Sequence, residues 1–504
     1  MARKPKVILT ADCSGDTMRI DGHRIGPWVR YYRDLCIYVD CRFDFKKHLL
    51  PHLTPDDTAI GTPGRVVGVS LKRHDGGPCG KVYCVDAWGG SNESAETLLQ
   101  HTLATRAMCE DSDITWRPTA AATAMELVRQ QCFKHFYPGI LPQWRELALS
   151  AIHAGPIIHA TGGGYAHHID RRKAYLHAMD RPFGVGKLVA CTHNRAMACG
   201  GLTDVTVNVP YHAVPPLSVR TKDRKVFYPI GTFRGVYPTV SLQVAIEKYG
   251  VEILRAHGAV RWQYTSDCMH DVCEAITSLP KLLAKPLYTR IWGKLCSTGG
   301  WIGSLEPTSW TTTGNGLKWS YDGGTYEQSR NPLHRPDIAA QIVGINHAAV
   351  MDTAASLSGI VAMHVDSIWT SDNVVDKVKI GPNVGDWKLE CTGALRYMGH
   401  GIYTHRRSDG TTKIGHCGFP TVDRPTAATI EHNMSLTGTE KPDSTYREWG
   451  TENPKISANA VSLPLAVDAP KMELYATHSP WDVTRWENGK LREEHKYQAP
   501  TLDV

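Results

Sequence analysis

Two carboxylates far apart in the chain, Asp170 and Asp366, occupy positions at which a protein could hold a metal ion. Asp170 follows the strand-like stretch 165–169 and precedes the helix-forming stretch 171–179. Asp366 interrupts an apolar, β-branched run over 359–370, the pattern of a buried hairpin with the acid at its tip. Because an unpaired buried carboxylate is costly, each acid must be paired, capped or bound to a metal.

Positive charge lies between the two acids in the sequence. Lys281 and Lys285 fall in the helix-forming stretch 281–294 and are one turn apart, so they share a helix face. A lone Asp at a strand end more often caps a helix than binds a metal, so the metal-binding interpretation depends on the second acid. The free amides of a helix that starts after Asp170 could also hold an anion. Two acids with a cationic helix indicate transfer from a nucleoside triphosphate.

The order and spacing of these segments resemble the polymerase motifs of family B DNA polymerases. Asp170, with Tyr175 five residues later, resembles the first motif of that family. Lys285, with Gly293 eight residues later, resembles its fingers motif, and the segment 363–367 resembles its third motif. The likeness is greatest to the small protein-primed branch found in phages and linear plasmids, and it covers most of the chain. It implies an α+β fold of the right-hand type, with palm, fingers and thumb, preceded by an RNase H-like 3′–5′ exonuclease-type domain.

The resemblance also implies roles for individual residues. Asp170 and Asp366 would be the catalytic acids and would bind two Mg²⁺ or Mn²⁺ ions. The residues implied to bind the nucleotide are Arg171, Arg172, Lys173, Ala174, Tyr175, Lys281 and Lys285. Tyr175 would pack under the deoxyribose and exclude a 2′-hydroxyl. The residues implied to bind DNA are Gly155, Arg224, Lys225, Tyr403, Arg406 and Lys413.

Some motif positions depart from the family pattern. His364 stands where the third motif has its first Asp, although Asp366 and Ser367 remain. His364 is therefore a further candidate metal ligand, and we expect it to favour Mn²⁺ over Mg²⁺ because imidazole suits softer divalent metals. The alternative, that His364 only packs or forms hydrogen bonds at the hairpin tip, stays open.

The N-terminal region resembles the exonuclease domain but lacks several of its acids. Strands are expected at 7–12, 36–40, 66–71 and 81–86, with a helix over 98–106. The family has Asp-x-Glu where this chain has Asp12-Cys13-Ser14, and the helix contains no acid. Two-metal hydrolysis needs several carboxylates, so we expect no proofreading.

At 504 residues the chain is too long for one ordinary core, and several domains are expected. The run Gly162-Gly163-Gly164 is interpreted as a tight turn, because no Gly-Lys-Ser/Thr follows it. The expected divisions are 1–115 degenerate exonuclease-like domain, 116–155 linker and helical hinge, 156–240 first palm part, 241–296 palm helix and fingers, 297–340 insertion, 341–395 second palm part, and 396–504 thumb and C-terminal tail.

Composition is consistent with a globular nucleic-acid-binding protein. The net charge of +6 has the sign that suits a polyanionic partner. None of the 14 cysteines lies in a Cys-x-x-Cys pair, which favours reduced thiols in a cytoplasmic protein, phage- or plasmid-encoded or of the host. No run approaches the roughly 20 apolar residues needed to span a bilayer, so no membrane partner is expected.

The expected function is that of a template-directed DNA polymerase, a nucleotidyltransferase that adds dNMP to a primer 3′-hydroxyl. Its expected partners are primer/template DNA and dNTPs, with a terminal protein or a primase as open sources of the primer. One alternative is a catalytically silent polymerase homologue that acts as a nucleic-acid-binding replication or defence factor. A second alternative is an active nuclease in the N-terminal domain.

Overall fold

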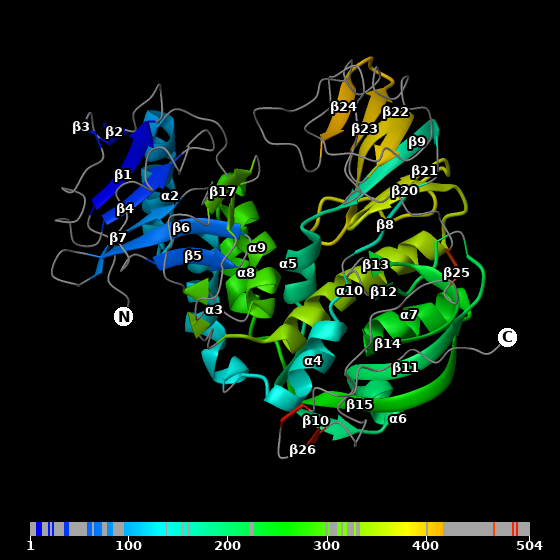
Figure 1. Cartoon of the computed structure of the whole chain (residues 1–504). Coiled ribbons are helices and arrows are strands. Elements are labelled where there is room, and N and C mark those ends of the chain that lie inside the picture. The colour runs from blue at the N-terminus through cyan, green and yellow to red at the C-terminus, as the bar shows by residue number, and fades with distance from the viewer. Residues whose placement is uncertain are drawn as a thin grey trace. The chain divides into compact units, whose positions relative to one another are not determined.

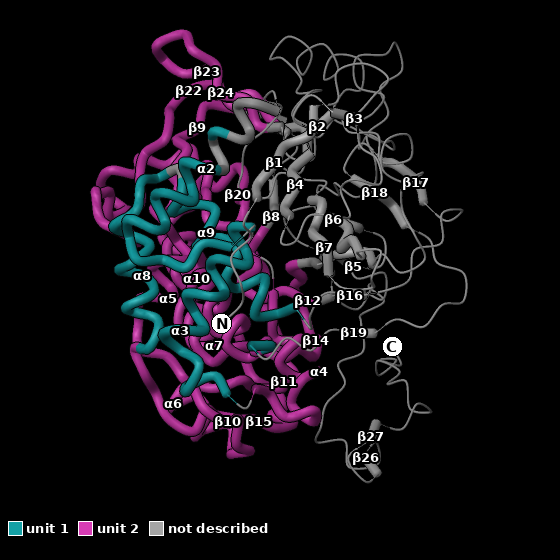
Figure 2. The backbone as a smooth tube through the Cα atoms, turned by 90° about the vertical axis from the view of Figure 1, so that its left-hand side faces the viewer, with its two compact units in different colours: residues 1–137, 268–334, 420–422 teal, residues 138–267, 335–419, 423–504 magenta. Residues whose placement is uncertain are grey.

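The computed structural model describes two long stretches of the chain and, outside them, only the backbone of individual strands. The stretches are 95–297, with gaps at 118, 138, 154, 160–161, 213 and 221–225, and 333–416, with a gap at 400–401. The chain divides into two compact units (Figure 2). Unit 1 comprises 1–137, 268–334 and 420–422, and unit 2 comprises 138–267, 335–419 and 423–504.

Unit 1 contains a mixed sheet with the strand order β19-β16-β5-β6-β7-β4-β1-β2-β3, to which β18, paired with β17, is joined through β6 (Figure 1). β4 is parallel to both β1 and β7. The strands are β1 (Val7–Asp12), β2 (Arg19–Ile20), β3 (His23–Arg24), β4 (Leu35–Val39), β5 (Thr58–Thr62), β6 (Arg65–Lys72), β7 (Pro78–Tyr83), β16 (Trp301–Ile302), β17 (Trp310–Thr313), β18 (Gly316–Trp319) and β19 (Glu327–Gln328). Its described helices are α2 (Ala95–Asp111), α3 (Ala120–Phe136), α8 (His270–Thr277) and α9 (Lys281–Cys296).

Most of the elements expected in the N-terminal region are present. The strands predicted at 7–12, 36–40 and 66–71 correspond to β1, β4 and β6, each within one residue of its expected bounds. The strand predicted at 81–86 is instead β7, which begins at Pro78. A proline is tolerated at the first position of a strand, where its missing N–H costs least, so the strand can begin at Pro78.

Unit 2 is built on two sheets. The first has the order β10-β15-β11-β14-β25 and the second the order β24-β23-β22-β9-β21-β20-β8. The first sheet comprises β10 (Phe183–Cys191), β11 (Leu202–Val209), β14 (Pro229–Pro238), β15 (Glu252–Ser266) and β25 (Val467–Asp468). The second, which is antiparallel throughout, comprises β8 (Ile157–His159), β9 (Gly162–Arg171), β20 (Ile360–His364), β21 (Ser367–Thr370), β22 (Trp387–Gly399), β23 (Ile402–Arg407) and β24 (Thr412–His416).

Five helices complete the described part of unit 2. They are α4 (Pro142–Ser150), α5 (Ala174–Met179), α6 (His193–Cys199), α7 (Thr239–Tyr249) and α10 (Pro336–Ala355). In the part of the chain that the structure describes, no helix is both long and apolar enough to cross a membrane.

One apolar core joins the two sheets of unit 2 through α7 and α10 (Figure 1). Ile169 of β9 and Ile368 of β21 enter this core from the seven-stranded sheet, and Val207 of β11 enters it from the five-stranded sheet. Leu242 of α7 and Val350 of α10 fill the space between them, and all five side chains are at most 1% exposed. Burial of one such aliphatic side chain stabilises the fold by about 1.5–3 kcal/mol. This core therefore holds β9 and β21 in place relative to α7 and α10.

β9 is longer than the sequence indicates. The glycine run Gly162-Gly163-Gly164, expected to form a tight turn, is part of this strand and pairs with 395–397 of β22. Pairing with β22 gives the backbone groups of these glycines their hydrogen-bond partners. A prediction from local turn propensity does not include this pairing with a distant strand. At the other end β9 continues through Arg171, and the helix predicted from that residue begins only at Ala174.

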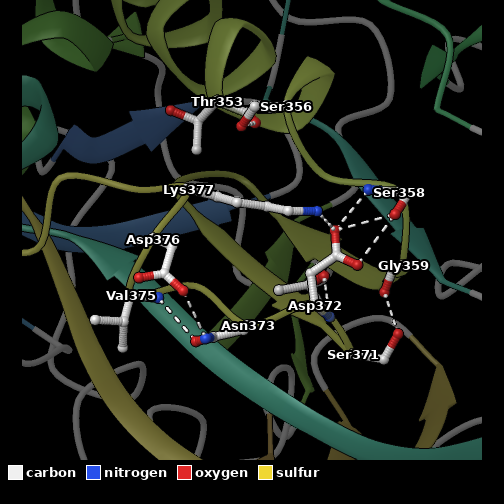
Figure 3. A network of polar contacts seen from close by, with 11 residues as sticks. Thr353, Ser356, Ser358, Gly359, Ser371, Asp372, Asn373, Val375, Asp376 and Lys377 are labelled. Atoms are coloured by element: carbon white, nitrogen blue, oxygen red, sulfur yellow. Dashed lines mark hydrogen bonds and ion pairs between the residues drawn. The ribbon is translucent and has the colours of Figure 1, made fainter.

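A polar network holds the open end of the β20–β21 hairpin, opposite the turn that carries Asp366 (Figure 3). The Asp372 carboxylate accepts hydrogen bonds from the Ser358 amide at 2.6 Å and from the Lys377 ammonium at 3.1 Å. The Ser371 amide donates to the Gly359 carbonyl at 2.8 Å. Burial opposes ionisation of Asp372, but the hydrogen bonds from Ser358 and Lys377 outweigh it and hold the pKa of Asp372 below its ordinary value.

We predict that Asp372→Asn lowers the free energy of unfolding at pH 7. A carboxyl group whose pKa is lower in the folded state stabilises the fold above its unfolded pKa, and this contribution disappears as the pH falls through the folded value. The difference between the wild type and Asp372→Asn should therefore shrink below about pH 4, the ordinary pKa of Asp. Urea unfolding of both proteins at a series of pH values measures this difference in the free energy of unfolding.

Asp376→Asn is the matched control, because the Asp376 carboxylate accepts only from the Asn373 amide, at 2.9 Å, among the contacts shown in Figure 3. At pH 7, Asp376→Asn should lower the free energy of unfolding by less than Asp372→Asn does. A stability difference for Asp372→Asn that stays constant from pH 7 to pH 3 would contradict the role of the charge.

Candidate functional site

The pairing of three strands places Asp170 next to the turn that carries Asp366. In the register of the seven-stranded sheet, Asp170 on β9 lies opposite Ser367 on β21 and opposite Lys388 on β22. The Ser367 hydroxyl donates to Asp170 Oδ1 at 2.5 Å, and the Arg171 amide donates to the Asp366 carbonyl at 3.0 Å. The structure thus brings the two segments that carry the predicted acids into direct contact at one end of the sheet.

The turn between β20 and β21 is conformationally strained and closely packed. Val365 has a φ of +60°, in the left-handed region that β-branched residues rarely adopt, which costs about 1–3 kcal/mol. The Val365 amide donates to the Pro156 carbonyl at 2.8 Å. Gly155 is so close to the turn that a Cβ on it would lie 2.7 Å from Val365 Cα. Packing against 155–156 therefore holds the turn in this conformation.

Arg171 and Arg172 anchor the end of β9 to neighbouring segments. The Arg171 side chain is buried, and it donates to Asn346 Oδ1 at 3.0 Å and to the Gly385 carbonyl at 3.2 Å. Burial, together with the charge of Arg181, lowers the pKa of Arg171 to about 10, although the charge of Asp366 acts in the opposite direction. Arg171 therefore remains a cation next to the Asp366 turn.

The Arg172 amide donates to the Asp386 carbonyl at 2.9 Å, and the Arg172 Nε donates to the Gly381 carbonyl at 2.7 Å. The backbone amides of Arg171 and Arg172 are therefore both engaged within the protein. If a triphosphate binds the backbone here, as the sequence predicts for 171–174, its contacts fall to Lys173 and Ala174.

Tyr175 lies in the first turn of α5, which begins immediately after Lys173. Lys173 has a φ of +47° and a ψ of +46°, so the chain turns sharply between the end of β9 and the helix. Burial is the main reason that the pKa of Tyr175 is raised, and the negative charge of Asp366 is the second. The role of Tyr175 at the predicted site stays a prediction.

His364 is the last residue of β20, and it lies opposite Ser367 in the hairpin register. It is half-buried, and its charge is one of several that lower the pKa of His168. His364 thus lies at the start of the turn that carries Asp366, and its role as a metal ligand stays a prediction.

Three residues predicted to bind DNA lie on β23 and β24, on the other side of β22 from β9. Tyr403 is 8% exposed, and its ring packs edge-on against Trp369 with centroids 5.1 Å apart. Lys413 Nζ lies 3.2 Å from His168 Nδ1 and 3.8 Å from Glu390 Oε2. Arg406 is exposed. β23 and β24 pair as a hairpin, and the Tyr403 ring belongs mainly to the apolar packing of the sheet.

Four further predicted residues lie in the other unit or outside the described residues. Lys281 and Lys285 are exposed on α9, whose apolar face, with Leu287 and Ile291, is buried. Both lysines belong to unit 1, whereas both acids belong to unit 2, so their role stays a prediction. Arg224 and Lys225 lie outside the described residues, although the flanking strands β12 (Val219–Arg220) and β13 (Val226–Phe227) pair as a hairpin.

Reasoning from the sequence left Ser367 out of the site residues, although this side chain binds the Asp170 carboxylate. It also left out a buried group formed by His168, Cys391 and His405. One signal was available, since His168 and Asp170 are two residues apart on a strand and so point to the same face. Nothing local indicates that Cys391 and His405 lie on the adjoining strands.

The fold of the chain resembles that of solved structures of one DNA polymerase. No protein-family model and no curated protein matches the sequence. The chain is, however, similar over most of its length to Phi29 DNA polymerase in complex with primer-template DNA and incoming nucleotides, with a TM-score of 0.61, 13% identity, and coverage of 89% of this chain and 95% of that chain.

Two further structures of Phi29 DNA polymerase are similar to the same extent. The orthorhombic crystal form has a TM-score of 0.59 at 13% identity, covering 82% of this chain and 91% of that one. The binary complex with primer-template DNA also has a TM-score of 0.59 at 13% identity, covering 86% of this chain and 96% of that one. At 13% sequence identity, these comparisons establish only that the chain shares a mixed α/β fold with antiparallel sheets.

We predict that Gly155→Ala lowers the free energy of unfolding by about 1–3 kcal/mol, the usual cost of overpacking. The added methyl group would lie 2.7 Å from Val365 Cα and 2.9 Å from the Val365 carbonyl oxygen, so the turn would have to move. Gly164→Ala is the control, because a Cβ there meets no described atom within 4 Å. Equal urea-unfolding curves for the two variants would show that Gly155 does not constrain the turn.

Proposed function

We propose that this protein is a template-directed DNA polymerase that transfers dNMP from a dNTP to a primer 3′-hydroxyl. The observation that carries the proposal is the contact between the end of β9 and the β20–β21 turn, which groups Asp170, Ser367 and Asp366. This contact occurs in a chain whose fold resembles Phi29 DNA polymerase, and structures of that enzyme contain primer-template DNA and incoming nucleotides. The same two substrates are proposed here as the partners.

Asp170 and Asp366 would hold two Mg²⁺ or Mn²⁺ ions, with His364 as a further candidate ligand. The carboxylate oxygens suit these ions, and the hydrogen bond from Ser367 to Oδ1 of Asp170 fixes the orientation of that carboxylate. When bound, the ions would favour attack by the 3′-hydroxyl and bear the charge of the leaving pyrophosphate. No proofreading is proposed, since the N-terminal region lacks the acids of the exonuclease motifs.

The protein's own groups would position these parts. Ser367 orients the Asp170 carboxylate, and the Arg171 amide fixes the Asp366 turn through its carbonyl. Lys281 and Lys285 would neutralise the triphosphate, while Lys173 and Ala174 would contact it through the backbone. Each of these tasks is orientation or charge neutralisation, which supply most of the catalysis in phosphoryl transfer.

The sheets and helices would then correspond to polymerase subdomains. The segments 156–240 and 341–395, which include β8, β9, β20, β21, α5 and α10, would form the palm. The helices α8 and α9 would form the fingers, and the region from 396, which includes β23 and β24, would form the thumb and tail. The strands β1 to β7 of the mixed sheet in unit 1 would belong to the degenerate exonuclease-like domain, 1–115. The segment 297–340, which contributes β16 to β19 to the same sheet, would be an insertion. DNA would be bound by Gly155, Arg224, Lys225, Tyr403, Arg406 and Lys413, with a terminal protein or a primase supplying the primer.

One observation favours the second candidate function, a catalytically silent homologue that binds nucleic acid. His364 stands at the end of β20, where the resemblance calls for an acid, and it lowers the negative charge available for cations. Such a protein would bind primer/template DNA and extend nothing.

We predict that Asp170→Ala and Asp366→Ala each reduce primer extension by at least about 10²-fold, since losing one electrostatic stabiliser of a transition state costs about 10²–10³-fold. DNA binding should be unchanged, because each substitution removes negative charge and no cation. The measurements are extension of a labelled primer in Mg²⁺ and in Mn²⁺, and fluorescence anisotropy for DNA affinity. Asp376→Ala, an exposed acid on the loop after β21, is the control.

Extension that survives either substitution would refute the assignment of the acids. Wild-type protein that binds DNA but extends no primer in either metal would favour the silent homologue. Metal-dependent shortening of the labelled strand, lost in Asp12→Ala, would favour the N-terminal nuclease.

We predict that Tyr175→Val raises ribonucleotide incorporation and leaves deoxynucleotide addition measurable. The aromatic ring lies in the first turn of α5, where it would block a 2′-hydroxyl, and valine removes the ring. Tyr175→Phe keeps the ring and should discriminate like the wild type. The ratio of kcat/KM for dNTP and NTP measures the effect, and an unchanged ratio in Tyr175→Val would remove this residue from the sugar site.

A further inference from the structure

Three buried side chains able to ligate a metal converge on one face of the seven-stranded sheet. His168 comes from β9, Cys391 from β22 and His405 from β23, three strands that are adjacent in that order. One candidate ligand atom from each lies within 4.8 Å of the others. The side chains are 2%, 7% and 0% exposed, so this group lies inside the protein and not on its surface.

The spacing of these atoms fits a tetrahedral metal ion. With Zn–S of about 2.3 Å and Zn–N of about 2.0–2.1 Å, a tetrahedral angle separates the sulfur from each nitrogen by about 3.6 Å. Cys391 Sγ lies 3.0 Å from His405 Nδ1 and 3.9 Å from His168 Nδ1, values that bracket this separation. Movements of about half an ångström would bring both nitrogens to the distance that zinc requires.

The surroundings of His405 orient its ring as those of metal-binding histidines do. Nε2 of His405 lies 3.1 Å from the Ala166 carbonyl oxygen, which can only accept a hydrogen bond. A proton on Nε2 satisfies that carbonyl, and in this tautomer the lone pair of Nδ1 faces Cys391 Sγ at 3.0 Å. A backbone carbonyl that fixes the tautomer in this way is the usual outer partner of a metal-ligating histidine.

A hydrogen bond from the Cys391 thiol to His405 would account for two of the three residues but not for His168. The His168 ring stacks on Trp369, with centroids 4.1 Å apart and planes 4° from parallel, so its orientation is fixed. Nε2 of His168 is buried and has no hydrogen-bond partner among the described residues. The nitrogen that a metal in this group would bind is Nδ1, which lies 3.9 Å from Cys391 Sγ, and Nε2 would keep the ring proton.

We propose that His168, Cys391 and His405 form a transition-metal site, with Zn²⁺ as the best-suited ion. One thiolate and two imidazoles are the donors that Zn²⁺ prefers over Mg²⁺, and their sulfur distinguishes this site from the carboxylates at Asp170 and Asp366. The metal would join β9, β22 and β23, and it would hold β9 two residues before Asp170. The site does not depend on the proposed polymerase function.

Lys413 is the group that this metal must displace. Its ammonium lies 3.2 Å from His168 Nδ1 and occupies that lone pair. Glu390 Oε2 is 3.8 Å from the same ammonium, and the Lys413 side chain is 28% exposed, so the ammonium can move toward Glu390 and solvent. Lys413 therefore competes with the metal, and its removal should strengthen metal binding.

The test is Zn²⁺ and Co²⁺ binding to the full-length protein, reduced and freed of metal with a chelator. We expect one tightly bound Zn²⁺ per chain, a higher melting temperature with Zn²⁺, and with Co²⁺ the thiolate charge-transfer and tetrahedral d–d absorption bands. Cys391→Ala should lose the charge-transfer band and more than about 100-fold in Zn²⁺ affinity, since loss of an outer partner alone costs 10–100-fold. Cys109→Ala, at a buried cysteine of α2, is the matched control and should bind like the wild type.

Lys413→Met keeps the packing of the stem and removes the competing ammonium, so it should bind Zn²⁺ severalfold more tightly than the wild type. This variant tests the site even if Cys391→Ala fails to fold. Wild-type protein without a thiolate-to-cobalt band, or equal Zn²⁺ affinity in the wild type and Lys413→Met, would overturn the proposal. Primer extension has no part in these measurements, so failure of the metal site and failure of the polymerase assignment are distinguishable.

Discussion

The pairing of β9 with β21 on one edge and β22 on the other is the constraint on which the rest of unit 2 depends. A strand slipped by one residue would exchange its two faces, moving Ile169 out of the core and Asp170 into it. The buried apolar cluster that contains Ile169 and Ile368 opposes this slip, because the slip would remove Ile169 from the cluster. Register, and not local propensity, therefore sets the position of Asp170 beside Ser367.

The strained backbone near the candidate site is confined to its two margins. Val365 in the hairpin turn and Lys173 before α5 both have positive φ, an arrangement that persists only where neighbouring contacts enforce it. Gly155 enforces the first by close packing, and the polar network around Asp372 holds the far end of the same hairpin. The β20–β21 hairpin is thus held both at the turn that carries Asp366 and at its open end. A site that must position charge requires such support.

The face of the sheet that carries Asp170 contains two chemically different groups. Oxygen donors lie at the end of β9, and a sulfur and two nitrogens lie two residues earlier on the strand and across its neighbours. Because hard cations prefer oxygen and zinc accepts sulfur and nitrogen, the two groups would select different ions. The Lys413 ammonium lies 3.2 Å from His168 Nδ1 and 3.8 Å from Glu390 Oε2, so it connects the second group to the Glu390 carboxylate.

The sequence by itself determined the elements whose signal is local. The apolar run of the β20–β21 hairpin, the one-turn spacing of Lys281 and Lys285 on a helix, and the Asp-Gly turn at 409–410 each follow from periodicity or turn chemistry. Tertiary structure decided the rest, because strand pairing joins residues without any local signal. It drew Gly162-Gly163-Gly164 into β9, delayed α5 until after Lys173, and brought Cys391 and His405 beside His168.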